Sequence, residues 1–321
     1  MSTSWMAPLG GLPGLGAAVL AGFLAVLALI CYCRAGAVPA LPPRREVLEF
    51  CAGQLAHASS PAEVRTVIAA LEALGQADPD ARQAVLDVVC GYLRRPSRPP
   101  GGTAELGVAG PAARAAAQAL LHARLVPQHG RSRHGSSELW SGLHLDLSGA
   151  SVQDLDLHGA VLRSATFAGT RFSGITRLTG ARCAGRVVFT DAVFTGPVRV
   201  DDVDFTGPVR FTGARFDTTV SFTHTTFRGP ADFAGASFTG AAEFGSARFL
   251  GDAAFSSQER GPAVFLARAG FEQTCFTAVT FAGVCWPDDT SFQHAEFAQP
   301  PHRLSDPRTE HAIAAAPAGG V

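Results

Sequence analysis

The sequence contains no lysine, so arginine carries every basic charge apart from histidine, and residues 1–33 contain no charged side chain at all. Arginine without lysine fits a GC-rich bacterial genome. The seven cysteines are odd in number and include no CxxC pair. This usage argues against a disulfide framework and favours a reducing compartment.

Motifs that would indicate catalysis or metal binding are also missing. The chain has no HExxH, P-loop or GxSxG sequence, and no GxGxxG follows a predicted strand. The ten histidines are scattered. The acidic pairs Asp201-Asp202 and Asp288-Asp289 fit solvated turns better than an acid–base pair or a cation site. We therefore expect no enzyme activity, no cofactor and no metal site.

Extreme charge is absent as well. Residues 34–139 contain 12 arginines and 9 acidic residues, and residues 141–300 contain 12 arginines and 16 acidic residues. A net charge of −4 over the second segment is too small to imitate the phosphate ladder of DNA. Nucleic acid is therefore not an expected partner.

What the sequence does contain is a repeat with a period of five or six residues. Upstream, Leu147, Val152, Leu157 and Leu162 are spaced by five, and Leu178, Cys183, Val200 and Trp286 hold the spacing where phenylalanine is missing. Arg260 is the one misfit. Neither a helix nor a simple strand has this period. Twenty of the 22 phenylalanines carry the repeat: Phe167, Phe172, Phe189, Phe194, Phe205, Phe211, Phe216, Phe222, Phe227, Phe233, Phe238, Phe244, Phe249, Phe255, Phe265, Phe271, Phe276, Phe281, Phe292 and Phe297.

The phenylalanines, and the residues that hold their spacing, are the centres of the repeat units. A small or β-branched residue lies two positions before each centre, for example Val187, Val209 and Ala231. Residues two apart in an extended segment face the same way. Each unit therefore points one small and one large side chain inward and the other three outward. The predicted structural core consists of Phe189, Phe194, Phe205, Phe211, Phe216, Phe222, Phe227, Phe233, Phe238, Phe244, Phe249 and Phe255.

The units resemble the pentapeptide-repeat family, whose units read A-(D/N)-(L/F)-x-x. The stretches 231–235 (ADFAG) and 236–240 (ASFTG) carry the likeness. The resemblance implies a right-handed quadrilateral β-helix with four units per coil. About 29 units fit between Leu145 and Phe297, which gives about seven coils and a rod roughly 34 Å long at ~4.8 Å per coil.

From Phe189 to Phe255 the spacing alternates between five and six residues, whereas the family keeps a strict five. Two units then span 11 residues, or half a coil, so the extra residues should lie at two opposite corners. Pro208, Pro230 and Asp252 should stack at one corner, and Pro197, Thr219 and Ala241 should stack at the other. Proline suits a corner, because no backbone N–H is needed there for a hydrogen bond between strands.

The segment 15–33 is an uncharged apolar run of 19 residues, which is long enough to cross a membrane as a helix. We read residues 1–33 as a transmembrane anchor. A cleaved signal peptide is the alternative, although the basic n-region is missing, and a lipid-modified Cys31 fits less well. The first charged side chains, Arg34, Arg44 and Arg45, follow the run. They predict a single-pass protein of the cell membrane whose repeat domain is cytoplasmic.

Residues 34–126 are predicted to be an α-helical segment. Helices are expected to begin at Ser60-Pro61, Asp78-Pro79 and Gly110-Pro111, and Gly75 should end the first of them. A linker at 127–140, the repeat β-helix at 141–299 and a disordered tail at 300–321 follow. Together with the Trp140-to-Gly149 stretch, the helical segment resembles that of actinobacterial membrane-anchored pentapeptide-repeat proteins.

These features predict a non-catalytic, membrane-tethered scaffold that binds another protein through the outer faces of the β-helix. The alternative is a DNA-mimic modulator of a type II topoisomerase, an activity that the resemblance implies for some family members. An enzyme with the helices as its catalytic domain is a third reading, which no motif supports. The sequence does not name the protein partner, the biological process or the oligomeric state.

Overall fold

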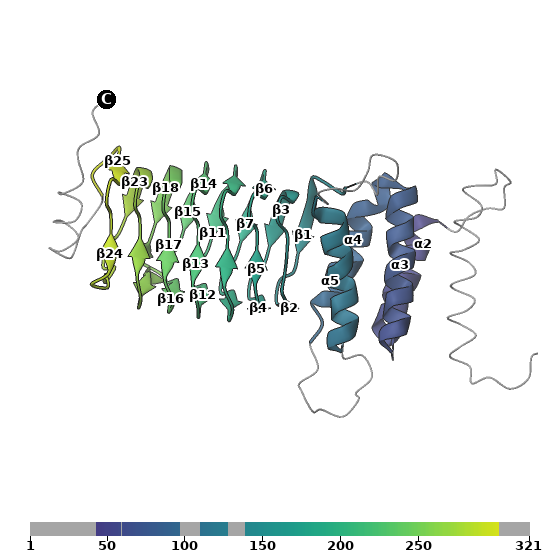
Figure 1. Cartoon of the computed structure of the whole chain (residues 1–321). Coiled ribbons are helices and arrows are strands. Elements are labelled where there is room, and N and C mark those ends of the chain that lie inside the picture. Colours follow the sequence, from purple (N-terminus) through teal and green to yellow (C-terminus); the bar gives the residue numbers. More distant parts are fainter. Residues whose placement is uncertain (1–42, 59, 97–109, 128–138, 302–321) are drawn as a thin grey trace, which may run out of the picture.

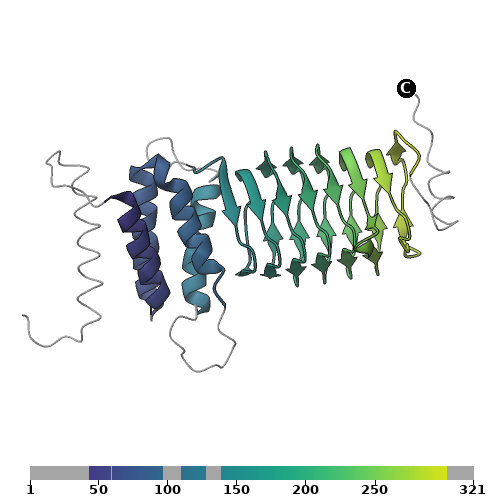
Figure 2. The ribbon, with the colours of Figure 1, turned by 180° about the vertical axis from the view of Figure 1, so that it is seen from behind.

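The computed structural model describes residues 43–58, 60–96, 110–127 and 139–301. The predicted anchor, most of the predicted linker and the tail beyond residue 301 lie outside these ranges. Among the described residues, no helix is long and apolar enough to cross a membrane. A helical bundle lies at one end of a long β-solenoid (Figures 1 and 2).

The bundle contains four helices and one short 3-10 turn among the described residues. They are α2 (Arg44–His57), α3 (Pro61–Ala77), η1 (Pro79–Ala81), α4 (Arg82–Leu93) and α5 (Pro111–Leu125). The predicted starts are present: the Ser60 hydroxyl accepts from the Glu63 amide at 3.2 Å, and Asp78 caps η1. Helix α2 was not predicted as a separate element, because only Cys51 and Leu55 of its side chains are buried.

Gly75 does not end helix α3, which continues to Ala77. The glycine is there for a different reason: a Cβ at this position would lie 2.4 Å from the Trp140 ring. Trp140 is 1% exposed, and its amide donates to the Arg124 carbonyl at 2.7 Å. Trp140, the last residue of the predicted linker, therefore packs against the helical bundle.

The solenoid has four faces built from short parallel strands, and successive turns of the chain pair with each other. Face 2 consists of β2 (Ser151–Gln153), β4 (Arg171–Ser173), β8 (Val193–Phe194), β12 (Arg215–Phe216), β16 (Ser237–Phe238) and β21 (Val264–Phe265). Face 3 consists of β5 (Thr176–Arg177), β9 (Val198–Arg199), β13 (Val220–Ser221), β17 (Ala242–Glu243), β22 (Ala269–Gly270) and β24 (Thr290–Ser291).

Faces 1 and 4 share the 11-stranded sheet, because three longer strands continue around the corner between them. Those strands are β3 (Val161–Thr166), β18 (Arg248–Ala254) and β23 (Cys275–Thr280). Face 1 also contains β1 (Leu143–Asp146), β7 (Val187–Val188), β11 (Val209–Arg210) and β15 (Ala231–Asp232). Face 4 also contains β6 (Arg182–Cys183), β10 (Asp204–Phe205), β14 (Thr226–Phe227) and β25 (Glu296–Phe297).

The repeat centres fill the interior in four columns. All twelve of the phenylalanines predicted as structural core are at most 1% exposed, and Cys183 is buried at another inward position. Rings of successive turns stack: the Phe189 and Phe211 centroids are 4.7 Å apart with an interplanar angle of 2°. Where successive turns carry phenylalanine, each ring stacks on its equivalent one turn away, and side chains fill the interior of the described solenoid.

The extra residues lie at two opposite corners, as the spacing predicted. The Val187 amide bonds to the Pro208 carbonyl and the Val209 amide to the Pro230 carbonyl, so these insertions stack between faces 4 and 1. The Val198 amide bonds to the Thr219 carbonyl and the Val220 amide to the Ala241 carbonyl, so the second set stacks between faces 2 and 3.

A hairpin interrupts the solenoid at Arg260, the residue that did not fit the repeat. Strands β19 (Ser256–Ser257) and β20 (Gly261–Pro262) pair antiparallel outside the coil. Phe255 on face 1 and the next centre, Phe265 on face 2, are therefore ten residues apart. Without the Arg260 unit, 28 centres from Leu147 to Phe297 make seven turns of four, one unit fewer than the spacing indicated.

The hairpin folds back along the corner between faces 1 and 2. Arg260 Nη1 lies 2.8 Å from Asp191 Oδ1, which belongs to a turn three coils earlier. A Cβ on Gly235 would lie 2.8 Å from the Arg260 carbonyl oxygen, so the hairpin packs directly on this glycine, whose φ is +66°. The hairpin thereby links the third turn to the sixth.

Candidate interaction surfaces

The helical bundle covers the open edge of the first turn. The Gln83 side chain of α4 donates to the His144 carbonyl at 2.9 Å and accepts from the His144 amide at 2.8 Å. Gln118 of α5 makes the same paired contact with Gln153, at 2.6 and 3.4 Å. Two glutamine amides therefore replace the neighbouring strand that this edge lacks, which protects it from pairing with another chain.

Arg114 of α5 is the buried cation of this junction. Its side chain is 5% exposed and donates to the carbonyls of Leu93, Arg95 and Ser151. Burial lowers the pKa of Arg114 below its usual value. Leu93 ends α4 and Ser151 begins β2, so one guanidinium joins two helices to the first turn at the negative end of the α4 dipole.

We expect Arg114→Met to destabilise the protein by about 1–3 kcal/mol, because the three carbonyls would be left buried without a donor. Arg199→Met is the matched control: Arg199 is exposed and makes no ion pair with a described residue, so its loss should cost less than about 0.5 kcal/mol. Urea unfolding of both variants measures the difference, and equal midpoints would show that Arg114 does not hold the junction.

A groove of about 700 Å³ lies between α5 and the first two turns. Ala112, Ala115 and Ala119 line its helix side, and Gln153 and Asp156 lie on its solenoid side. Buried side chains fill the interior of the described part of the solenoid, and no cleft opens into it there. The bundle nevertheless creates a concave surface at the end of the rod, which the sequence did not reveal.

The polar end of the groove is a hydrogen-bonded cluster around Asp156. Its carboxylate lies 2.9 Å from His158 Nδ1 and 2.7 Å from Arg177 Nη1. Burial raises the pKa of Asp156, but the hydrogen bonds from His158 and Arg177 outweigh it and lower the pKa overall. The ring of His122 on α5 lies 6.1 Å from that of His158. Among the described residues, no group of three or more His, Cys, Asp or Glu side chains could hold a metal ion.

Charge is distributed unevenly over the four outer faces. Each corner is counted with the face that precedes it along the chain. Face 1 then carries one arginine and three carboxylates, face 2 carries three arginines and four carboxylates, and face 3 carries two arginines and five carboxylates. Face 4 carries five arginines and three carboxylates. Face 4 is therefore the one face of the described solenoid on which arginine predominates.

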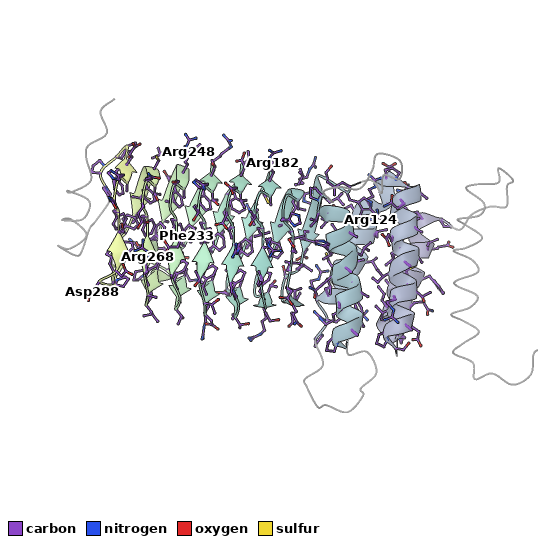
Figure 3. The ribbon with its side chains drawn as sticks, viewed as in Figure 1. Arg124, Arg182, Phe233, Arg248, Arg268 and Asp288 are labelled. Atoms are coloured by element: carbon purple, nitrogen blue, oxygen red, sulfur yellow. The ribbon has the colours of Figure 1, made fainter. Side chains whose placement is uncertain are left out.

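Most carboxylates on the acidic faces are partly neutralised. Arg268 lies 3.0 Å from Glu243 and 3.1 Å from Asp289 and is paired with Glu272 as well. These carboxylates, Glu272 above all, raise the pKa of Arg268. Asp289 of the acidic pair Asp288-Asp289 thus belongs to an ion-pair network at the corner after face 2. Figure 3 shows Arg268 and Asp288 in this part of the solenoid. Asp201 and Asp202 lie on face 3 and its following corner, where the Ser221 hydroxyl donates to Asp201 and His224 lies 3.8 Å from Asp202.

Arg171 and Arg215 form an outward stripe on the solenoid. Both pair in register with Val193 of the intervening strand, so they lie on face 2 two turns apart. Arg215 is also paired with Asp217 at 2.5 Å. Of the solenoid cysteines, Cys285 is exposed, Cys275 is partly exposed and Cys183 is buried.

The architecture defines a repeat protein of the β-solenoid class with a helical cap. Models of pentapeptide repeats match residues 145–176, with eight copies, and residues 178–226 and 222–257, with nine copies. The chain therefore contains a domain of pentapeptide repeats, which forms a right-handed solenoid. The matches end at residue 257, where the hairpin begins, although the coil itself continues to Phe297. No curated protein and no solved structure matches the chain.

Proposed function

We propose that the protein is a non-catalytic scaffold that binds another protein through the outer faces of its solenoid. The observation that carries this proposal is the closed aromatic core, which leaves regular outer faces as the main surface of residues 141–299. Solenoids of pentapeptide repeats generally serve as structural or binding proteins. A stiff one-dimensional frame with flat faces suits partner binding.

We further propose that residues 15–33 tether this scaffold to the cell membrane, with the solenoid on the cytoplasmic side. The apolar run and the first arginines after it support this part of the proposal. Full-length protein should fractionate with membranes, and deletion of residues 1–33 should release it. Secretion of a chain that begins after Ala40 would instead establish the signal peptide.

Thiol labelling of intact cells tests the topology independently. Cys285 is exposed, whereas burial raises the pKa of Cys183 to about 12. An impermeant thiol reagent should therefore leave Cys285 unmodified until the cells are broken, and Cys183 should stay protected afterwards. Labelling of Cys285 in intact cells would place the solenoid outside.

Proximity labelling from the full-length protein, compared with the chain lacking residues 1–33, tests the scaffold. We expect a defined set of neighbours that depends on the tether. Changing Arg171 and Arg215 to glutamate should reduce capture of any partner that uses face 2. Turnover of a metabolite that is lost on changing one polar residue within 44–126 would overturn the non-catalytic function.

The DNA-mimic alternative receives little support from the outer faces. Carboxylates outnumber arginines most strongly on face 3, but Asp156 is bound there by Arg177, and Glu243 and Glu272 by Arg268 from the neighbouring corner. Protection of a type II topoisomerase by the purified protein in a supercoiling assay would favour this alternative over the scaffold.

A further inference from the structure

Face 4 carries most of the solenoid arginines that make no ion pair within the described part of the chain. Of the 12 arginines between residues 141 and 300, five are paired: Arg177, Arg215, Arg228, Arg260 and Arg268. Of the other seven, which make no ion pair with a described residue, three are spread over the other faces as Arg171, Arg199 and Arg210. Four lie on face 4 and its following corner: Arg163, Arg182, Arg186 and Arg248.

All four side chains are exposed: Arg182 and Arg248 lie on face 4 itself, and Arg163 and Arg186 lie at the corner that follows it. Arg182 pairs in register with Asp204, Asp204 with Thr226, and Thr226 with Arg248, so the two arginines lie in one row three turns apart. At ~4.8 Å per turn this separation is roughly 14 Å. Figure 3 shows both side chains at the same edge of the rod. Asp204, the register neighbour of Arg182, is already held by Arg228 at 2.8 and 3.1 Å.

Exposed apolar side chains lie among the arginines. Val161 begins β3 and is 37% exposed, and Leu250 of β18 is 39% exposed. Arginine combined with apolar contact area is typical of protein–protein interfaces, whereas phosphate-binding surfaces are polar and basic throughout. Because arginine forms bidentate pairs with carboxylates, this surface is complementary to a chain rich in aspartate or glutamate.

We propose that face 4 is the docking surface for an acidic polypeptide segment of a partner protein. This inference rests on the proposed scaffold function and assigns it to one face and one partner chemistry. Arg163, Arg182, Arg186 and Arg248 bind the carboxylates, and Val161 and Leu250 contact the apolar side chains between them. The remaining faces, on which carboxylates predominate, repel such a segment and so fix the side of the rod on which it docks.

Fluorescently labelled poly-L-glutamate is the probe for this surface, with full-length protein in detergent. We expect Arg182→Glu combined with Arg248→Glu to weaken binding at least tenfold. Arg171→Glu combined with Arg215→Glu, which reverses as many charges on face 2, should change it less than twofold. Binding should also weaken as salt is raised. Circular dichroism and melting of both variants confirm that the fold is intact.

Equal weakening by the two double variants, or no binding of poly-L-glutamate at all, would overturn the assignment to face 4. Tighter binding of a DNA duplex through the same arginines would overturn the choice of an acidic polypeptide. Proximity labelling with both double variants separates this inference from the scaffold function. If neighbours persist in the Arg182/Arg248 variant and are lost in the Arg171/Arg215 variant, the scaffold stands and the face 4 inference fails.

Discussion

Phe233→Ala is expected to lower the free energy of unfolding by about 3–5 kcal/mol, the range for truncating a fully buried phenylalanine. The ring is 0% exposed and stacks on Phe211 at 5.0 Å and on Phe255 at 4.9 Å. Removing the ring leaves a cavity between the Phe211 and Phe255 rings. Backbone hydrogen bonds between successive turns hold those turns in place, so they have little freedom to collapse into the cavity. Phe222→Ala, on face 3, should have a similar effect.

Thr239→Ala is the matched control for the phenylalanine substitutions. Thr239 is exposed on face 2, and its replacement should cost less than about 0.5 kcal/mol. Thr223 is less suitable, because its hydroxyl lies 2.9 Å from the Ser221 hydroxyl. Guanidinium unfolding of the variants measures the difference, and equal losses for Phe233 and Thr239 would mean that the inward and outward positions had been assigned wrongly.

Gly229→Ala is expected to destabilise the solenoid by about 1–3 kcal/mol, the cost of forcing an extra methyl group into a packed site. Gly229 stacks on Gly207 at the corner after face 4, and a Cβ would lie 2.7 Å from the Gly207 carbonyl carbon. The new methyl group would clash with the Gly207 backbone, which is held by hydrogen bonds between successive turns. This backbone cannot move aside as a flexible side chain would. Gly251 meets Gly229 in the same way, at 2.6 Å.

Gly245→Ala separates this steric effect from the general loss of a glycine. Gly245 lies on the outer side of face 3, and the nearest atom to a new Cβ there is the Glu272 carbonyl oxygen at 3.9 Å. Its substitution should be neutral within about 0.5 kcal/mol. Thermal unfolding compares the two, and a Gly229→Ala variant as stable as the Gly245→Ala variant would show that the corner has room to spare.

The period of the sequence determined the solenoid. Phe189 to Phe255 lie inward because every fifth or sixth residue repeats the same environment, so one local rule predicts all of them. The 22-residue steps from Pro208 to Pro230 to Asp252 likewise predicted the corners, since parallel in-register stacking converts sequence spacing directly into position. The helix starts at Ser60, Asp78 and Gly110 were also readable, because capping is a local interaction.

Contacts between residues without a periodic counterpart were decided only by the tertiary structure. The pairing of Gln83 with His144, the packing of Gly75 against Trp140 and the reach of Arg260 back to Asp191 each join positions more than 60 residues apart. No spacing in the sequence marks such partners, because each contact occurs once. The gathering on face 4 of arginines without an ion pair to a described residue also depended on the structure, since pairs such as Arg228–Asp204 and Arg260–Asp191 determine which solenoid arginines are neutralised.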